Sequence, residues 1–239
     1  MTPGTSASNQ RNAGSFDAFF EGWLVRQEHY LDELQSVQQR SHESQEDDLK
    51  DLITRVLSHY QQYLEEKSRE AQRNIFLVFS QTWLSSFERA SLWIGGFKPG
   101  FALKVVSNSV QDLSPEQSER IKRLVEETRV EERVLNEELA RVQESMAAPP
   151  LIELARKRAR RRMSVEMAGE EEAALDTLKK AVEEVVDGAD LLRMTTAMKV
   201  VEILNPVQSV RGFLTILQGF IGFRKVSAGA KPVAGGLMT

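Results

Sequence analysis

The sequence of 239 residues contains no cysteine. Disulfide bonds, thiolate nucleophiles and thiolate metal ligands are therefore excluded, which fits a reducing compartment. No apolar run reaches the roughly 18 residues that a membrane-spanning helix needs, and none follows a basic start as in a secretory signal. We therefore expect the protein in the nucleus, the cytoplasm or both.

Histidine is scarce, which limits catalysis and metal binding. The three histidines, His29, His42 and His59, do not lie at helical spacing from one another. The sequence has no Walker loop, no dinucleotide-binding glycine pattern, no zinc-protease motif and no serine-hydrolase nucleophile motif. Carboxylate pairs such as Glu131 and Glu132 are typical of solvated helix faces. We expect no catalytic residue and no metal site, and a protein that is not an enzyme.

Strand-like alternation is missing too, and so is an internal repeat of constant period. Hydrophobic residues make up 41% of the chain and charged residues 28%, a balance typical of long amphipathic helices. The net charge of -4 argues against general electrostatic binding of nucleic acid by the whole protein. These features predict an all-α fold, a single-domain bundle of about seven or eight helices.

Large apolar side chains divide the chain into three parts. Residues 1–14 and 227–239 contain few of them, so we expect disordered tails there. The helical domain should cover residues 15–226. Within it, apolar spacing, capping patterns and prolines predict helices over approximately 15–34, 49–79, 85–94, 101–109, 115–146, 151–162, 170–204 and 210–221. Continuous apolarity over 75–79 predicts complete burial of that segment.

The segment from Thr82 to Pro99 is the most distinctive, with two tryptophans and two phenylalanines. Ser85 and Glu88 have the spacing of a capping box that opens a short helix. Gly95 suits the left-handed conformation that follows a helix end, and the residue before Pro99 favours an extended or turn conformation. We predict a rigid aromatic corner that contains no catalytic side chain.

An aromatic stripe on the first helix has two interpretations. Phe16, Phe19, Phe20 and Trp23 follow helical spacing. They suit the core of a bundle. They also suit a surface that docks a partner, since aromatic anchors dominate binding hot spots.

A basic cluster has six cations in seven residues, namely Arg156, Lys157, Arg158, Arg160, Arg161 and Arg162. It is either a nuclear-localisation or anion-binding patch, or a solvated helix face that pairs with acidic neighbours. Binding of DNA through this run alone would be weak and very sensitive to salt.

Two further features leave alternatives open. The apolar residues of 115–146 lie near heptad spacing, which suits either a homodimer or an intramolecular bundle. Aromatic residues around Trp83, Trp93 and Phe101 suit either a filled core or a cavity for a lipid-like ligand.

Four patterns together resemble the delay-of-germination domain of plants, which also forms the C-terminal half of TGA-type bZIP transcription factors. They lie at residues 19–27, 83–99, 113–117 and 190–208. The defining residues of the second pattern are Trp83, Glu88, Arg89, Trp93, Gly95, Gly96, Phe97 and Pro99. The resemblance covers approximately residues 15–225.

The resemblance implies a stand-alone regulator, because only a short tail precedes Ser15 where TGA factors carry a basic region and a zipper. The family's haem-binding histidine pair has no counterpart in 212–225, so no cofactor is expected. The family's partners include protein phosphatases of the abscisic-acid pathway and calmodulin. We therefore expect a protein-binding regulator in abscisic-acid, seed-dormancy or stress signalling. The alternatives are a nuclear protein that binds DNA or bZIP factors, and a sensor of a small apolar ligand.

Overall fold

The computed structural model describes residues 6–40, 45–81, 83–147 and 165–229, which form seven α-helices and no strand. This confirms the predicted all-α fold. The helices are α1 (Ser6–Gln39), α2 (Glu46–Ser80), α3 (Ser86–Ala90), α4 (Pro99–Ser109), α5 (Pro115–Ala147), α7 (Val165–Ile203) and α8 (Pro206–Gly229). The basic cluster and the helix expected over 151–162 lie outside the described residues.

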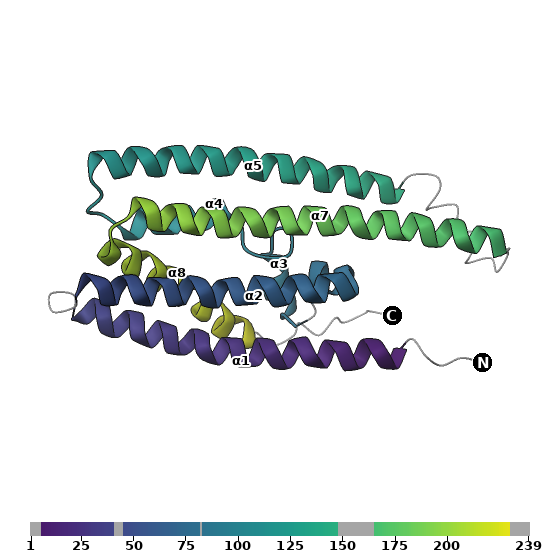
Figure 1. Cartoon of the computed structure of the whole chain (residues 1–239), viewed down its shortest axis with the longest axis horizontal. Helices are drawn as coiled ribbons and strands as arrows, with labels where there is room; N and C mark the ends of the chain where they lie inside the picture. Colours follow the sequence, from purple (N-terminus) through teal and green to yellow (C-terminus); the bar gives the residue numbers. More distant parts are fainter. Residues whose placement is uncertain (1–5, 41–44, 82, 148–164, 230–239) are drawn as a thin grey trace, which may run out of the picture.

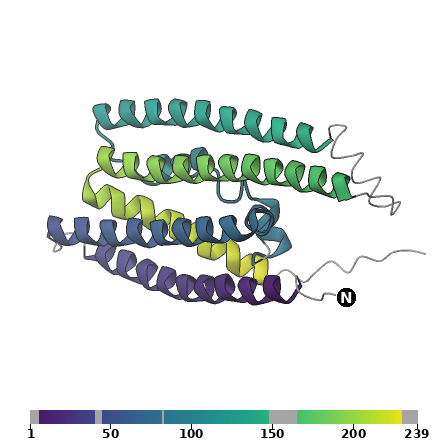
Figure 2. The same cartoon turned by 45° about the vertical axis from the view of Figure 1, so that its right-hand side comes forward.

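Long helices form two antiparallel pairs (Figure 1). The first pair is α1 with α2 and the second is α5 with α7, and the two pairs meet where α2 packs against α7. Helix α8 crosses the first pair obliquely and contacts α1, α2 and α4 (Figure 2). The short helices α3 and α4 connect α2 to α5. The aromatic corner therefore follows the end of α2 and leads into α4.

Helical spacing of apolar residues explains how α2 packs. Leu49, Leu52, Ile53 and Val56 lie on one side of α2 and are all buried, since positions three and four apart share a helix face. They join Leu214 of α8 in one hydrophobic cluster. The apolar residues that helical spacing places on one face of α2 therefore form part of the hydrophobic core.

The end of α2 differs from the prediction. Asn74 has a non-helical backbone (φ −156°, ψ 91°) and kinks the helix. Its Oδ1 accepts a hydrogen bond from the backbone N–H of Phe76 at 3.2 Å, so the asparagine caps the part of α2 that follows. The predicted complete burial of 75–79 is wrong, because Phe76 and Phe79 are 40% and 36% exposed after the kink.

The outer helix boundaries also differ. The first helix begins at Ser6, earlier than the predicted start at Ser15. The last helix continues to Gly229, beyond the predicted end of the domain at residue 226. Extending a formed helix fixes one residue per hydrogen bond and needs no new nucleus, so weakly apolar segments can continue it.

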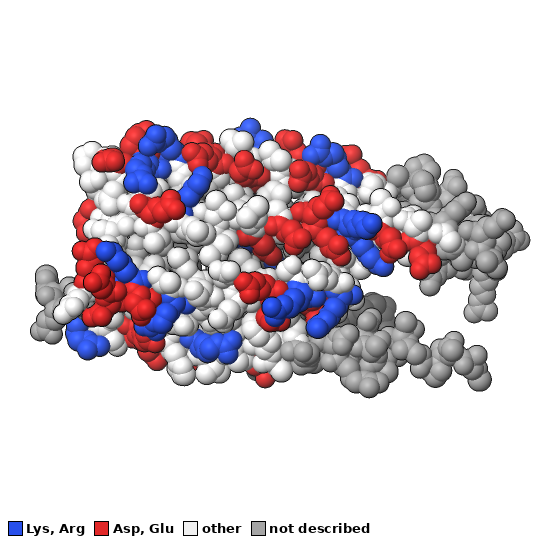
Figure 3. Space-filling view, in the orientation of Figure 1, with Lys and Arg blue, Asp and Glu red and all other residues white. Residues whose placement is uncertain are grey.

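Acidic and basic side chains are intermixed over α2, α5 and α7 on the face shown in Figure 3. Such mixing is typical of solvated faces of amphipathic helices. Among the described helices, none combines the length and the apolarity that crossing a membrane requires.

Candidate functional site

A tight turn forms the centre of the aromatic corner. The backbone N–H of Trp93 donates to the carbonyl of Gly96 at 2.7 Å, and the N–H of Gly96 donates to the carbonyl of Trp93 at 3.2 Å. Both central residues have positive φ, 44° at Ile94 and 62° at Gly95. A β-branched residue rarely adopts this conformation, so other contacts must hold Ile94 in it.

Those contacts come from Arg193 of α7, whose side chain is 1% exposed. Its Nη2 donates to the carbonyls of Trp93 at 2.5 Å and Ile94 at 2.9 Å, and its Nε donates to the carbonyl of Phe97 at 2.8 Å. The planar guanidinium thus binds three carbonyls of the corner at once, which a lysine ammonium could not match. We call this arrangement the Arg193 clamp.

A second layer of charge fixes the clamp. Asp190 accepts a hydrogen bond from Arg193 Nη1 at 2.5 Å and from Lys67 Nζ of α2 at 2.8 Å. Gln81 donates to the carbonyl of Gly95. Burial lowers the pKa of Lys67 to about 8, against the attraction of Asp190, which raises it. The cluster connects α2, α7 and the corner through groups that are all hydrogen-bonded, as buried charge requires.

The two glycines of the corner have different physical roles. Gly95 supplies the left-handed conformation, as predicted, although α3 ends earlier, at Ala90. Gly96 instead leaves room for the clamp, because a Cβ there would lie 2.7 Å from Cζ of Arg193. An alanine at Gly96 would therefore displace the guanidinium.

Glu132 of α5 fixes the first turn of α4. Its carboxylate accepts a hydrogen bond from the backbone N–H of Gly100 at 2.7 Å and lies 3.4 Å from Nζ of Lys98. Pro99 is buried at the first helical position, where its fixed φ suits a helix start. Glu132 was predicted to lie on a solvated face. That prediction is wrong, because the residue is 5% exposed.

One aromatic side chain of the corner and one in the adjacent first turn of α4 point outward. Phe97 is 40% exposed and Phe101 is 67% exposed. The Phe97 ring lies 5.8 Å from the ring of Tyr60 in α2, and the Arg193 guanidinium lies 5.9 Å from its centroid. The corner thus presents aromatic surface from a backbone that a buried charge network fixes.

The remaining residues of the pattern at 83–99 lie in α3 or next to it. Ser85 and Glu88 form the predicted capping box, with bonds of 2.8 and 3.2 Å. The Glu88 carboxylate also lies 3.3 Å from Nη1 of Arg224 in α8. Arg89 is exposed and bonds to Ser86 within α3. Trp83 packs against Phe16 with ring centroids 4.3 Å apart.

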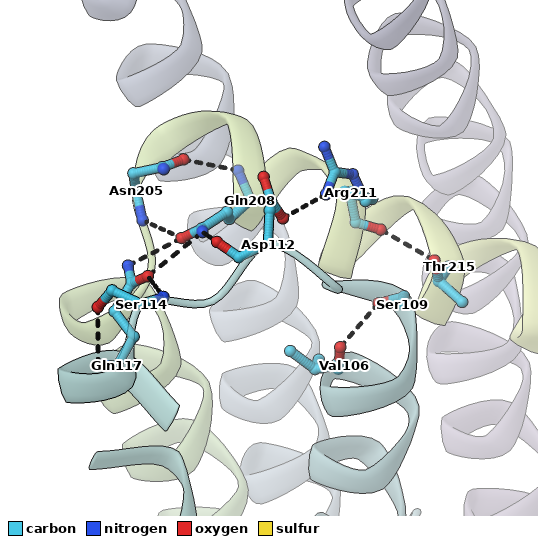
Figure 4. A network of polar contacts seen from close by, with 9 residues as sticks. All are labelled: Val106, Ser109, Asp112, Ser114, Gln117, Asn205, Gln208, Arg211 and Thr215. Carbon is cyan, nitrogen blue, oxygen red and sulfur yellow. Dashed lines mark hydrogen bonds and ion pairs between the residues drawn. The ribbon is translucent and has the colours of Figure 1, made fainter. Parts of the chain in front are cut away.

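The third and fourth sequence patterns meet at a second polar junction (Figure 4). Gln117 and Gln208 bond to each other at 2.9 Å, and each also closes a capping box at the start of its own helix. Gln208 donates to the carbonyl of Asp112 at 2.9 Å as well. Patterns that are far apart in sequence therefore pair in space, 83–99 with 190–193 and 113–117 with 205–208.

The aromatic stripe of α1 lies mostly in the core. Phe16, Phe20 and Trp23 are each 4% exposed, and Phe19 is half-buried beside them. Trp23 stacks on His59 of α2 at 4.7 Å. The burial agrees with core packing and leaves these three rings inaccessible to a partner of the folded domain.

Two hollows of the described surface do not suit an apolar ligand. One, lined by Val37, Leu49 and Val210, has a volume of about 40 Å³, which holds little more than water. The other is lined mostly by charged residues, including Asp48 and Arg55. The described residues contain no cluster of three histidine or carboxylate side chains that could hold a metal ion.

The buried charges have only weak signals in the sequence. Lys67 falls at a position of α2 that the apolar spacing marks as core, and Arg193 interrupts an apolar run in α7. A charged residue at an apolar position is the signal that could have identified both. The pairing of Lys67 with Asp190, 123 residues away, had no sequence signal, whereas Arg193 and Asp190 lie three residues apart on α7.

Comparisons with known proteins identify the family of this chain. A family model, DOG1, described as seed dormancy control, matches residues 30–108. Protein RESPONSE TO ABA AND SALT 1 of Arabidopsis thaliana is 38% identical over 226 residues, which cover 90% of this chain and 94% of that protein. The chain belongs to the DOG1 family. Protein ZW2 of the same plant is 36% identical and is covered to 89% of its length.

The DOG1 family also connects this chain to transcription factors, as the resemblance predicted. Transcription factor TGA7 of Arabidopsis thaliana is 32% identical over 89% of this chain. The chain spans about half of that protein, 55% of its length. The match of the DOG1 model extends from α1 to α4 and so includes the aromatic corner.

Proposed function

We propose that this DOG1-family protein is a non-enzymatic regulator that acts by binding other proteins in abscisic-acid, seed-dormancy or stress signalling. The observation that carries the proposal is the exposure of Phe97, on the corner held by the Arg193 clamp, and of Phe101, in the adjacent first turn of α4. Aromatic side chains held in one conformation lose little entropy on binding, which makes them effective anchors. A relative named for its response to ABA and salt supports the signalling context.

Protein partners follow from this proposal. Phosphatases or calmodulin, which the family resemblance implies, are the first candidates. The regulator acts stoichiometrically, because it changes a partner by occupying its surface. We assign no role to a cofactor.

The test combines affinity purification with genetics. The tagged full chain is expressed in plants that lack the native protein, and bound proteins are quantified after cross-linking. We expect one or a few proteins at near-stoichiometric yield, and altered germination or growth on ABA or salt when the chain is absent. No enriched protein together with a normal response in the null plants would refute the proposal.

A second candidate function is association with DNA or with DNA-bound bZIP factors in the nucleus. It is favoured by the similarity to TGA7 over 89% of this chain. A variant without residues 156–162 tests it, compared with the full chain for nuclear accumulation and for binding to duplex DNA at several salt concentrations. Direct phosphate contacts predict a steep loss of affinity with salt, whereas capture of bZIP proteins without such dependence points to association through protein.

A further inference from the structure

One face of α4 differs in charge from the rest of this acidic protein. Residues 97–111 contain no aspartate or glutamate, and their only charged residues are Lys98 and Lys104. Helix α8, which packs against α4, also contains no acidic residue between 206 and 229. A chain with 35 acidic residues thus leaves two packed helices free of them.

The exposed side chains of α4 follow helical spacing. Phe101, Lys104 and Asn108 are spaced by three and four residues and are all exposed. Phe97 is also exposed, two residues before the helix begins at Pro99. Leu103 and the other buried positions of α4 lie on its opposite side, in the core. We call these four exposed residues the α4 face.

Lys104 on the α4 face and the neighbouring Lys98 differ in how far their charges are neutralised. Lys98 lies near the carboxylate of Glu132, at 3.4 Å. Lys104 forms no ion pair with any described residue. The face therefore combines two exposed aromatic rings with uncompensated positive charge, which favours a ligand with apolar anchors and negative charge.

Resting on the proposed function, we infer that the α4 face binds an acidic segment of a partner protein that carries large apolar side chains. The apolar side chains pack on Phe97 and Phe101, and carboxylates of the segment pair with Lys104. Two lysines are too few for the many phosphate contacts typical of duplex DNA, which favours a peptide over nucleic acid.

Peptide display on the full chain tests this inference. Random peptides of about 16 residues, roughly four helical turns, are selected on the wild-type protein and counter-selected on a Phe101→Ser, Lys104→Glu variant. We expect the selected peptides to be rich in aspartate, glutamate, leucine and aromatic residues. Their affinity should fall by about tenfold or more with Phe101→Ser and should also fall with Lys104→Glu.

Matched surface variants control for folding and for general charge. Phe76→Ser and Lys180→Glu change the same residue types at exposed positions elsewhere and should leave affinity unchanged. Circular dichroism should show the same melting temperature for Phe101→Ser as for wild type, because that side chain is largely exposed.

Several results would overturn the inference. These are selection of basic or neutral peptides, no selection at all, or binding that survives both changes on the α4 face. Binding of duplex DNA or of phosphatidylserine vesicles that is lost with Phe101→Ser would assign the face to nucleic acid or membrane instead. If plant proteins are captured equally by wild type and by both variants, the proposed function stands and this inference fails.

Discussion

Replacing Arg193 by methionine should strongly destabilise the fold. The substitution removes the guanidinium and leaves the carbonyls of Ile94 and Phe97 without their donor. A buried unsatisfied acceptor costs about 1–3 kcal/mol, and removing one partner of a buried ion pair costs about 3–5 kcal/mol. Two such carbonyls and one broken pair sum to about 5–11 kcal/mol. Because Lys67 still pairs with Asp190, we expect a loss near the lower end, about 5 kcal/mol of unfolding free energy.

Urea titration followed by tryptophan fluorescence measures this loss. Trp93 reports on the corner directly, since the Arg193 guanidinium lies 5.4 Å from its ring. The control is Arg129→Met, which breaks an exposed pair with Glu126 and should cost at most about 0.5 kcal/mol. Arg193→Lys should be intermediate, because it keeps the charge and loses the fork of donors. A loss below about 1 kcal/mol in Arg193→Met would refute the clamp as a determinant of the fold.

Three further predictions concern buried positions. Gly96→Ala should lower the free energy of unfolding by about 2 kcal/mol or more, because the new Cβ displaces the Arg193 guanidinium. The control is Gly222→Ala, whose Cβ meets open space, so it should be neutral or stabilising in the same urea titration. The pKa of Lys67 is lowered to about 8 in the folded state, so as pH rises the folded protein loses this proton before the unfolded protein does. The free energy of unfolding should therefore rise by about 2 kcal/mol from pH 8 to pH 9.5, relative to Lys67→Met. A constant difference between the two proteins over that range would contradict it. Burial, together with the charge of a nearby arginine, lowers the pKa of His59 to about 4, so only the unfolded state gains a proton as pH falls. Wild type should lose about 2 kcal/mol relative to His59→Phe between pH 6.5 and pH 5, and parallel stability curves would exclude this.

Local patterns predicted where several helices begin. The capping boxes at Ser85 and Ser114 form with the expected partners three residues later. Pro206 begins α8, as the predicted break requires. These features depend on neighbours in sequence, so they can be read without the fold. The kink at Asn74 was missed because an asparagine within an apolar stretch can either continue a helix or cap a new one.

Side-chain accessibility was harder to predict. The stripe that begins at Phe16 fits a core or a docking surface equally well, because helical spacing defines a face without saying what covers it. The reverse holds for Phe101, which lies in an apolar segment and is 67% exposed. Covering helices from elsewhere in the chain decide both outcomes.

The sequence by itself determined the all-α class, several helix starts, the need for a glycine at Gly95 and the family. All of these depend on composition, on short spacing or on similarity. Only the tertiary structure decided that the buried charges of Lys67 and Arg193 fix the corner. Their partners lie about 100 residues away, and burial turns ordinary surface charges into groups that must be paired. The same packing leaves two phenylalanines at the surface, from which the α4 face and its proposed acidic partner follow.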